Sequence, residues 1–220
     1  MNKPLVSLEK LERYDEAECR CALQKLLEPL GGLKAHVSEG ERVLVKPNLL
    51  SPHKPSDAVC THPSLLYALC DMIAEQGATP VLGDSPALVS ARKVLVQLGA
   101  YDELVKRGVE VVEFDQITPV SGSTFRSLEV STEVLKADKV INFCKLKTHA
   151  MMVLTCAVKN LYGCIVGKRK AAYHLHVRES RELFARLMMD LAQIVSPVLS
   201  IVDGVEAMEG NGPGSGDPRR

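Results

Sequence analysis

Short runs of apolar residues alternate with longer amphipathic segments along most of the chain. The apolar runs predict strands at 42–48, 79–84, 109–114, 138–143 and 198–204. The amphipathic segments predict helices at 16–30, 62–77, 90–99, 101–107 and 181–195, several of them bounded by Pro or Gly. A further run at 125–131 has the composition of an edge strand.

Strands that alternate with helices indicate an α/β fold, with a mainly parallel sheet that carries helices on both faces. We expect a single α/β domain over residues 1–208 and a Gly- and Pro-rich loop or tail over 209–220. Two interpretations of this end stay open: a disordered tail, or a chain cut inside a longer domain. We favour a domain that is truncated at its C-terminal end.

The charge balance limits the partners that the chain can have. The 27 basic and 27 acidic residues give a formal net charge of zero, which argues against nucleic acid or an anionic membrane as a partner. Trp is absent, so a base-stacking surface is disfavoured. Apolar runs fall short of the roughly 20 residues of a membrane span, and the N-terminus lacks the apolar stretch of a secretory signal. We therefore expect a cytoplasmic protein.

The seven cysteines do not form a C-x-x-C pair. A zinc ribbon and a ferredoxin-type cluster run both need such spacing, so neither is predicted. Scattered cysteines in a reducing compartment are expected to be reduced thiols within the core.

Charged and amide side chains stand at the carboxyl ends of four predicted strands. They are Lys46 and Asn48, Asp84, Lys145 and Lys147, and Asp203. Ligands of open parallel sheets bind outside the carboxyl ends of the strands, so we expect these side chains to converge on one crevice. A single charged residue at such a place is ordinary turn material; the repetition over four strands is what favours a site.

The residue types indicate the chemistry of this crevice. Lysines 46, 145 and 147 suit a phosphate or carboxylate group, and Asn48 can both donate to and accept from a ligand. The helix start at His62 offers free backbone N–H groups to an anion. We therefore predict a small anionic ligand. The alternative is structural: each lysine could bond loop carbonyls and point into protein.

A metal is the second prediction for the same crevice. Asp84 and Asp203 could hold a hard divalent cation such as Mg²⁺, or act as acid and base groups. His174 and His176 would lie on one face of a strand, but the neighbourhood lacks a third metal ligand and their role stays open. The GKRK stretch at 167–170 lacks Walker spacing and is as consistent with a solvated turn as with a phosphate loop.

Several segments taken together resemble one known family. They are VLVKPNLL, the T-H-P helix start, GATPVLGDSP, INFCKLKTHAMMVLTCAVKNLYG, the His-containing segment after GKRK, and IVDGVEAMEGNGPGSG. Over roughly residues 40–216 the chain is similar to the domain of unknown function 362 family of bacteria and archaea. The resemblance implies that the motif positions are Lys46, Asn48, Asp84, Lys145, Lys147, His149, Lys159, Asn160 and Asp203.

The resemblance also implies an iron–sulfur association. Members of the family are often fused to, or encoded as, ferredoxin-like proteins whose cluster cysteines lie beyond this domain. The sequence ends at Arg220 without such cysteines, so a 4Fe-4S cluster is not supported within this chain. A ferredoxin-like domain or electron-transfer partner is expected only for longer relatives.

Two functions from different classes follow. In the first, the chain is an enzyme or redox-associated subunit: His149 would transfer protons, because its ordinary pKa is near 6.5, and Lys147 with a lowered pKa is an alternative base. Lys159 and Asn160 would join the ligand-binding set. In the second, the chain is a non-catalytic cofactor-binding or scaffold module. An enzyme needs an acid and a base near one point, whereas a binding module needs only convergent donors.

Overall fold

The computed structural model describes residues 5–86, 88–167, 169–177 and 180–220. Its helices are α1 (Glu16–Leu27), α2 (Pro63–Glu75), α3 (Ala91–Gln97), α4 (Tyr101–Lys106), α5 (Thr132–Lys136), α6 (Ala157–Asn160), α7 (Arg169–His176) and α8 (Arg181–Val195). Short 3₁₀ helices are η1 (Glu28–Leu30), η2 (Leu33–Ala35), η3 (Pro55–Asp57) and η4 (Leu161–Cys164). The strands are β1 (Arg42–Lys46), β2 (Thr79–Asp84), β3 (Glu110–Glu113), β4 (Ile117–Val120), β5 (Leu128–Ser131), β6 (Lys139–His149), β7 (Val153–Thr155), β8 (Leu199–Glu209) and β9 (Asp217–Arg219).

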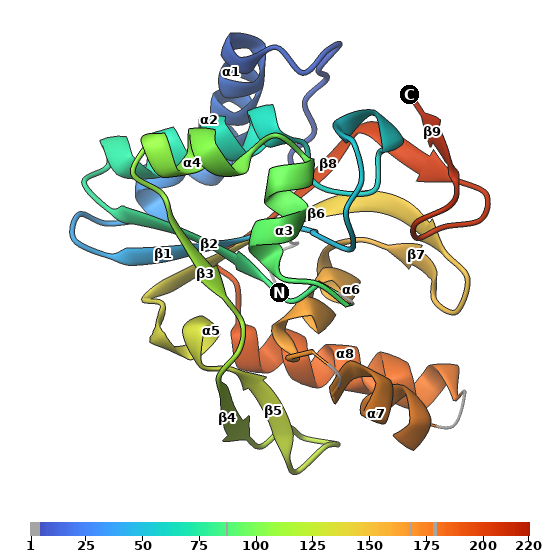
Figure 1. The fold of residues 1–220 in the computed structure, drawn as a ribbon. Coiled ribbons are helices and arrows are strands. Elements are labelled where there is room, and N and C mark those ends of the chain that lie inside the picture. The colour runs from blue at the N-terminus through green and yellow to red at the C-terminus, as the bar shows by residue number, and fades with distance from the viewer. Residues whose placement is uncertain (1–4, 87, 168, 178–179) are drawn as a thin grey trace.

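A seven-stranded sheet runs through the centre of the molecule (Figure 1). The strand order is β3-β2-β1-β6-β8-β9, and β7 pairs with β6 beside this path. Strands β3, β2, β1, β6 and β8 run parallel to one another, whereas β7 and β9 are added in antiparallel fashion. The predicted α/β fold with a mainly parallel sheet is therefore confirmed.

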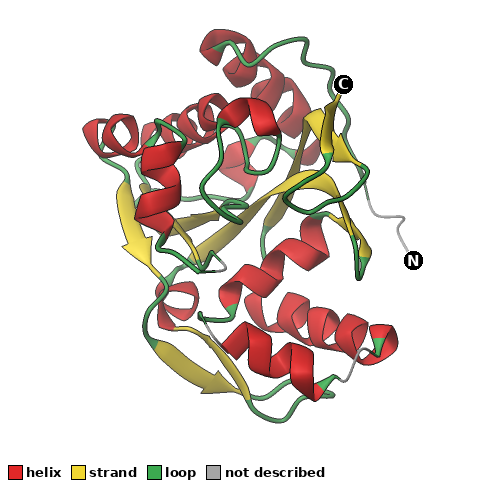
Figure 2. Ribbon diagram, turned by 45° about the vertical axis from the view of Figure 1, so that its right-hand side comes forward, coloured by secondary structure: helices red, strands yellow, loops and turns green. Residues whose placement is uncertain are grey.

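Helices cover both faces of the sheet (Figure 2). On one face, α1 to α4 pack over strand residues such as Val43, Val45 and Phe143. On the other face, α8, η4 and the small β4–β5 sheet pack over Leu44 and Val81. Because the central strands are buried on both faces, they appear in the sequence as nearly continuous apolar runs rather than alternating ones.

Two strands are longer than the sequence predicts. β6 continues from the expected 138–143 to His149, and β8 continues from the expected 198–204 to Glu209. The added halves are paired with the short antiparallel strands β7 and β9, which have weak sequence signals of their own. Lys145 and Lys147 therefore lie inside a strand, not in a loop that follows one.

Two further predictions differ from the structure. His174 and His176 lie on helix α7, not on a strand, so the expected shared strand face does not exist. On a helix, side chains two positions apart point in different directions. Within the expected loop or tail at 209–220, Asp217–Arg219 forms β9, where Arg219 is opposite Ala207 of β8.

A buried carboxylate on α8 organises the loop between β4 and β5. Asp190 is 2% exposed and accepts hydrogen bonds from the backbone N–H groups of Ser123, Thr124 and Phe125 at 3.2, 2.9 and 2.7 Å. Burial alone would raise the pKa of Asp190, but these hydrogen bonds outweigh it and hold the pKa below its ordinary value. A Cβ atom at Gly122 would lie 2.4 Å from the same carboxylate, so the loop follows its surface closely.

We expect Asp190→Ala to lower the free energy of unfolding by roughly 2–4 kcal/mol, because three backbone donors lose their acceptor. Urea denaturation measures this loss, and Met189→Ala, at a neighbouring position that is 53% exposed, is the control. Since the folded pKa of Asp190 is lowered, its contribution should be present above about pH 4 and should disappear as the pH falls further. Equal losses in the two variants would contradict this role.

Candidate functional site

The ends of β1 and β2 carry a buried ion pair. Lys46, which is 0% exposed, lies 2.8 Å from the Asp84 carboxylate and donates a second hydrogen bond to the carbonyl of Pro47 at 2.9 Å. The two oxygens of Asp84 also accept from the backbone N–H groups of Leu49 and Ser85 at 2.8 and 2.9 Å. Both charges are thus satisfied inside the protein.

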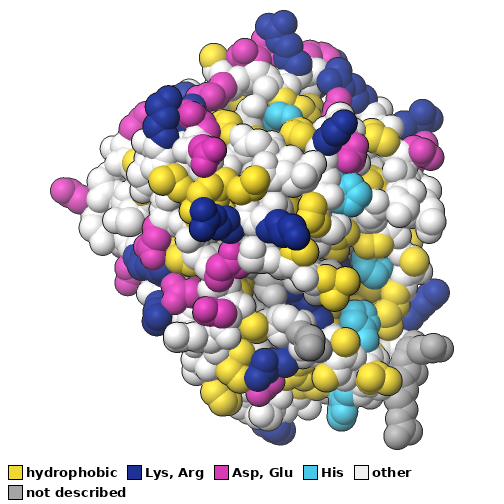
Figure 3. Space-filling model, in the orientation of Figure 1, with side chains coloured by type: hydrophobic (Ala, Val, Ile, Leu, Met, Phe, Trp, Pro, Cys, Tyr) yellow, Lys and Arg dark blue, Asp and Glu magenta, His cyan; other side chains and the backbone are white. Residues whose placement is uncertain are grey.

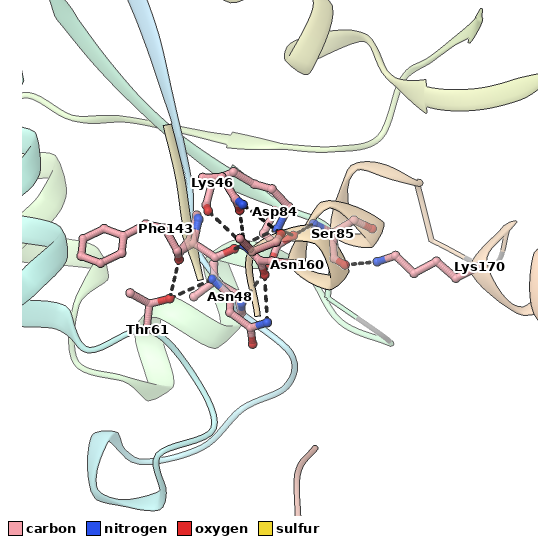
Figure 4. A network of polar contacts seen from close by, with 12 residues as sticks. Lys46, Asn48, Thr61, Asp84, Ser85, Phe143, Asn160 and Lys170 are labelled. Atoms are coloured by element: carbon pink, nitrogen blue, oxygen red, sulfur yellow. Dashed lines mark hydrogen bonds and ion pairs between the residues drawn. The ribbon is translucent and has the colours of Figure 1, made fainter. Parts of the chain in front are cut away.

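Three asparagines link the segment after β1, strand β6 and helix α6. Figure 4 shows two of them, Asn48 and Asn160, close to the Lys46–Asp84 pair. The side-chain amide of Asn160 donates to Asn142 Oδ1 at 2.8 Å, and its oxygen accepts from Asn48 at 2.9 Å. The Asn48 oxygen in turn accepts from Lys147 Nζ at 2.9 Å. Lys147 also donates to the carbonyl of Val59 at 2.7 Å, so its position is fixed by two acceptors.

Gly163, in η4, allows α6 and η4 to approach the ion pair. A Cβ atom at this position would lie 2.1 Å from Asp84 Oδ1 and 2.6 Å from Lys46 Nζ. Any larger residue would therefore displace buried charged atoms. The close approach brings Lys159 and Asn160, which directly precede η4, to the edge of the sheet.

A cavity of about 490 Å³ opens at this edge, between the sheet and α7. The titratable side chains in its described lining are Asp84, Lys147, His149, Lys159, Tyr162, Lys170 and His174. Leu50, Leu88 and Pro213 line it as well and give it an apolar wall. Asn48 and Asn160 from the asparagine network face the same space.

The three cavity lysines share a perturbed acidity. Burial is the main cause in each case: it lowers the pKa of Lys147 to about 7 and the pKa values of Lys159 and Lys170 to about 8. Neighbouring cations add to the effect, since Lys145 and Lys159 act on Lys147, and Lys46 acts on both Lys159 and Lys170. A negative charge in the cavity would stabilise the protonated lysines and so act against this lowering of their pKa values.

His149 is held as a neutral hydrogen-bond donor. Its Nδ1 accepts from the backbone N–H groups of Met151 and Met152 at 3.1 and 3.2 Å, which leaves the proton of the neutral ring on Nε2. Burial, with the nearby cations Lys159 and Lys147, lowers the pKa of His149 to about 4. The structure thus favours a donating imidazole over the proton-transferring one suggested by an ordinary pKa.

Three of the predicted site residues lie in a second polar cluster. Lys145 lies 2.9 Å from Asp203 and donates to the Tyr14 hydroxyl at 3.0 Å. Tyr14 donates to Asp203 at 2.7 Å and stacks on the His62 ring with 3.6 Å between centroids. The backbone N–H of His62 also donates to Asp203, at 3.0 Å. These groups satisfy one another and tie the N-terminal segment to the sheet.

The ten predicted site residues therefore divide into three groups. Asn48, Asp84, Lys147, His149, Lys159 and Asn160 line the cavity. Lys46 lies behind it, and Lys145, His62 and Asp203 belong to the second cluster. The two proposed metal ligands are thus in separate clusters, each beside a lysine.

The described residues do not gather a set of metal or cluster ligands. Within 5–86, 88–167, 169–177 and 180–220, no three His, Cys, Asp or Glu side chains gather as a metal site would require. The predicted Mg²⁺ ligands lack a third partner in that part of the chain. The iron–sulfur association of longer relatives stays a prediction.

Three titratable residues of the described cavity lining, Tyr162, Lys170 and His174, were not among the predicted site residues. Lys170 donates to the carbonyl of Ser85, and His174 packs against the rings of Tyr162 and Phe184. Lys170 is the last residue of the GKRK stretch, whose basic composition was the one sequence signal that could have placed it in an anion site. Its placement over β2 depends on the packing of α7, which local sequence does not specify.

Another hollow of similar size, about 520 Å³, lies beside α1 and η2. Its charged lining residues Lys25, Glu28 and Lys34 are all exposed to solvent. Exposed charges there are ordinary surface groups. Figure 3 likewise shows both signs of charge interspersed over one face of the molecule, with no continuous basic surface on that face. The cavity at the sheet edge is therefore the better candidate.

None of the helices in the described ranges combines the length and apolar character that crossing a bilayer requires. The predicted cytoplasmic location stays a prediction.

A curated relative, the thylakoid-associated protein sll1697 of Synechocystis sp. (strain ATCC 27184 / PCC 6803 / Kazusa), is 41% identical over 215 residues. The match covers 97% of this chain and 67% of that protein.

Two solved structures share the fold. The lactate racemase apoprotein from Thermoanaerobacterium thermosaccharolyticum matches with a TM-score of 0.54 and 12% identity, over 90% of this chain and 50% of that one. A protein from Thermotoga maritima matches with a TM-score of 0.57 and 14% identity, over 98% of this chain and 55% of that one. This chain thus spans about half the length of these structures, and at such identities the likeness concerns the fold alone.

The sequence resemblance is tested directly by a family model. The model described as domain of unknown function (DUF362) matches residues 43–220, which include every cavity residue named above. The chain therefore belongs to the DUF362 family.

Proposed function

We propose that the cavity at the sheet edge binds a small anion that carries a phosphate or carboxylate group. One observation carries the proposal: Lys147, Lys159 and Lys170 line one cavity, and Asp84, the single carboxylate in its described lining, is already paired with Lys46. Positive charge in a partly dehydrated space is costly without a counter-charge. A bound anion would supply it.

The shape of the cavity favours an organic anion over a bare inorganic one. A volume of about 490 Å³ lies within the range typical of small-molecule sites. Leu50, Leu88 and Pro213 offer apolar contact to a carbon body, while the lysines lie around the charged group. Asn48 and Asn160 are restrained by their own network, so they would orient a ligand with little loss of side-chain freedom.

The same residues could carry out proton transfer. Lys147 has a pKa of about 7, so a substantial fraction of it is a neutral amine near neutral pH and can accept a proton. His149 would donate from Nε2 to a developing negative charge. These roles assign the base to Lys147 and the electrophilic donor to His149. A non-catalytic binding module would use the same lysines and would not need the His149 tautomer.

We expect Lys147→Met and Lys170→Met each to weaken sulfate binding about tenfold or more, since each removes a charge-assisted hydrogen bond. Isothermal titration calorimetry measures the affinity, and circular dichroism checks that each variant is folded. Lys106→Met is the matched control, because the Lys106 side chain is 78% exposed and does not line the cavity. Unchanged affinity in both cavity variants would remove this function.

The affinity for sulfate should fall as the pH rises from about 6 to about 9. The charge of sulfate is constant over this range, so the change reports the protein. Lys147, Lys159 and Lys170 lose protons there, whereas His149 stays neutral because its pKa is about 4. His174, whose pKa is lowered by burial and by the charge of Lys159, does not oppose the trend, because any proton that it loses also removes positive charge. An affinity that is flat or rises with pH would contradict the assignment.

A further inference from the structure

Lys159 differs from the other lysines near the cavity in its contacts. Lys46 is paired with Asp84, Lys147 has two oxygen acceptors, and Lys170 donates to the carbonyl of Ser85. Among the described residues, Lys159 Nζ has neither a hydrogen-bond acceptor nor a carboxylate within ion-pair distance. Its amine is therefore free to react with whatever enters the cavity.

Two aromatic rings hold this amine in place. Lys159 Nζ lies 4.7 Å from the centre of the Tyr162 ring and 5.5 Å from that of Phe184. The Tyr162 hydroxyl donates to the carbonyl of Lys170 at 2.6 Å, and the ring packs edge-on against Phe184, so the wall is itself fixed. Ring faces stabilise a cation without taking up its N–H groups in strong hydrogen bonds.

The surroundings also make a neutral amine accessible. Burial, then the charges of Lys170 and Lys46, lower the pKa of Lys159 to about 8, so about a tenth of it is neutral at pH 7. For a lysine with an ordinary pKa the neutral fraction would be below about one in a thousand. A lysine in an apolar pocket beside other cations is the arrangement that activates an amine as a nucleophile.

We propose that Lys159 forms an imine with an anionic carbonyl compound, an aldehyde or ketone that also carries a carboxylate or phosphate group. The proposal rests on the proposed function of the same cavity, because Lys147 and Lys170 would hold the anionic group. The aromatic pair remains useful after reaction, since a protonated imine keeps the positive charge over the same two rings.

The reaction balances without an oxidant or reductant. The Nζ lone pair attacks the carbonyl carbon, the C=O π electrons move to oxygen, and a proton passes from nitrogen to that oxygen. The resulting carbinolamine loses its hydroxyl with one more proton as water, and a C=N bond replaces the C=O bond. His149 Nε2–H lies in the same cavity lining and could donate a hydrogen bond to the departing oxygen.

The test uses glyoxylate as the probe and sodium cyanoborohydride to reduce any imine to a stable amine. Intact-mass and peptide mass spectrometry should show one preferred adduct, on Lys159, and sulfate should protect against it. Lys159→Arg keeps a positive charge but cannot form an imine, so it should lose the adduct. Because Lys159 also belongs to the proposed anion site, sulfate binding is judged on the unaltered protein. Lys106→Met, with its exposed position, should be labelled on Lys159 like the unaltered protein.

The outcomes separate the two proposals. If sulfate binds but the adducts are spread over surface lysines, imine formation at Lys159 is wrong and the anion site stands. The same holds if Lys159→Arg still gives one preferred adduct, because that adduct must lie on another residue. If sulfate does not bind the unaltered protein, the anion site itself is wrong. Because the adduct is first mapped on the unaltered chain, the result does not depend on a variant that fails to fold.

Discussion

Lys46 and Asp84 form an ion pair almost wholly removed from solvent, and the arrangement of the sheet edge depends on it. Taking two charges out of water costs several kcal/mol per ion, and only close pairing with further hydrogen bonds compensates. The structure supplies these from Pro47, Leu49 and Ser85. Since Asp84 is paired with Lys46, its negative charge does not neutralise the lysines that face the cavity.

Gly163 and the asparagine network extend the same constraint. Without a Cβ atom, Gly163 allows the chain after α6 to lie against the pair. Asn160 then connects this chain to β1 and β6 at once. The parts of the site are therefore positioned by buried polar contacts, which have strict geometric requirements, and not by apolar packing alone.

The limits of the main helices and part of the candidate site could be predicted from the sequence, because they follow from hydrophobic periodicity and from the order of the strands. The helices α2 and α8 begin and end within a residue or two of their predicted limits, since Pro63, Gly77 and the apolar stripe of α8 are strong local signals. Asn48 and Asp84 share one cavity because the parallel strands β1 and β2 end at the same edge of the sheet, and Lys147 and His149 reach it from the extension of β6. Lys159 and Asn160 reach it from α6.

The other features of the site could not be predicted, because they depend on tertiary contacts that a single sequence does not specify. The register of the β6–β8 pairing shifts between Lys145 and Lys147, and the two lysines lie in different polar clusters. The position of Lys170 depends on how α7 packs, and the tautomer of His149 depends on the amides of the turn that follows it. Each of these is decided by tertiary contacts.

The most direct measurement is a crystal structure of the protein soaked with tungstate, whose anomalous scattering locates a tetrahedral anion without ambiguity. We predict one strong peak in the cavity, within hydrogen-bond distance of Lys147, Lys159 and Lys170. Tungstate bound only at the protein surface, with the three lysine side chains turned away from a common point, would contradict the account.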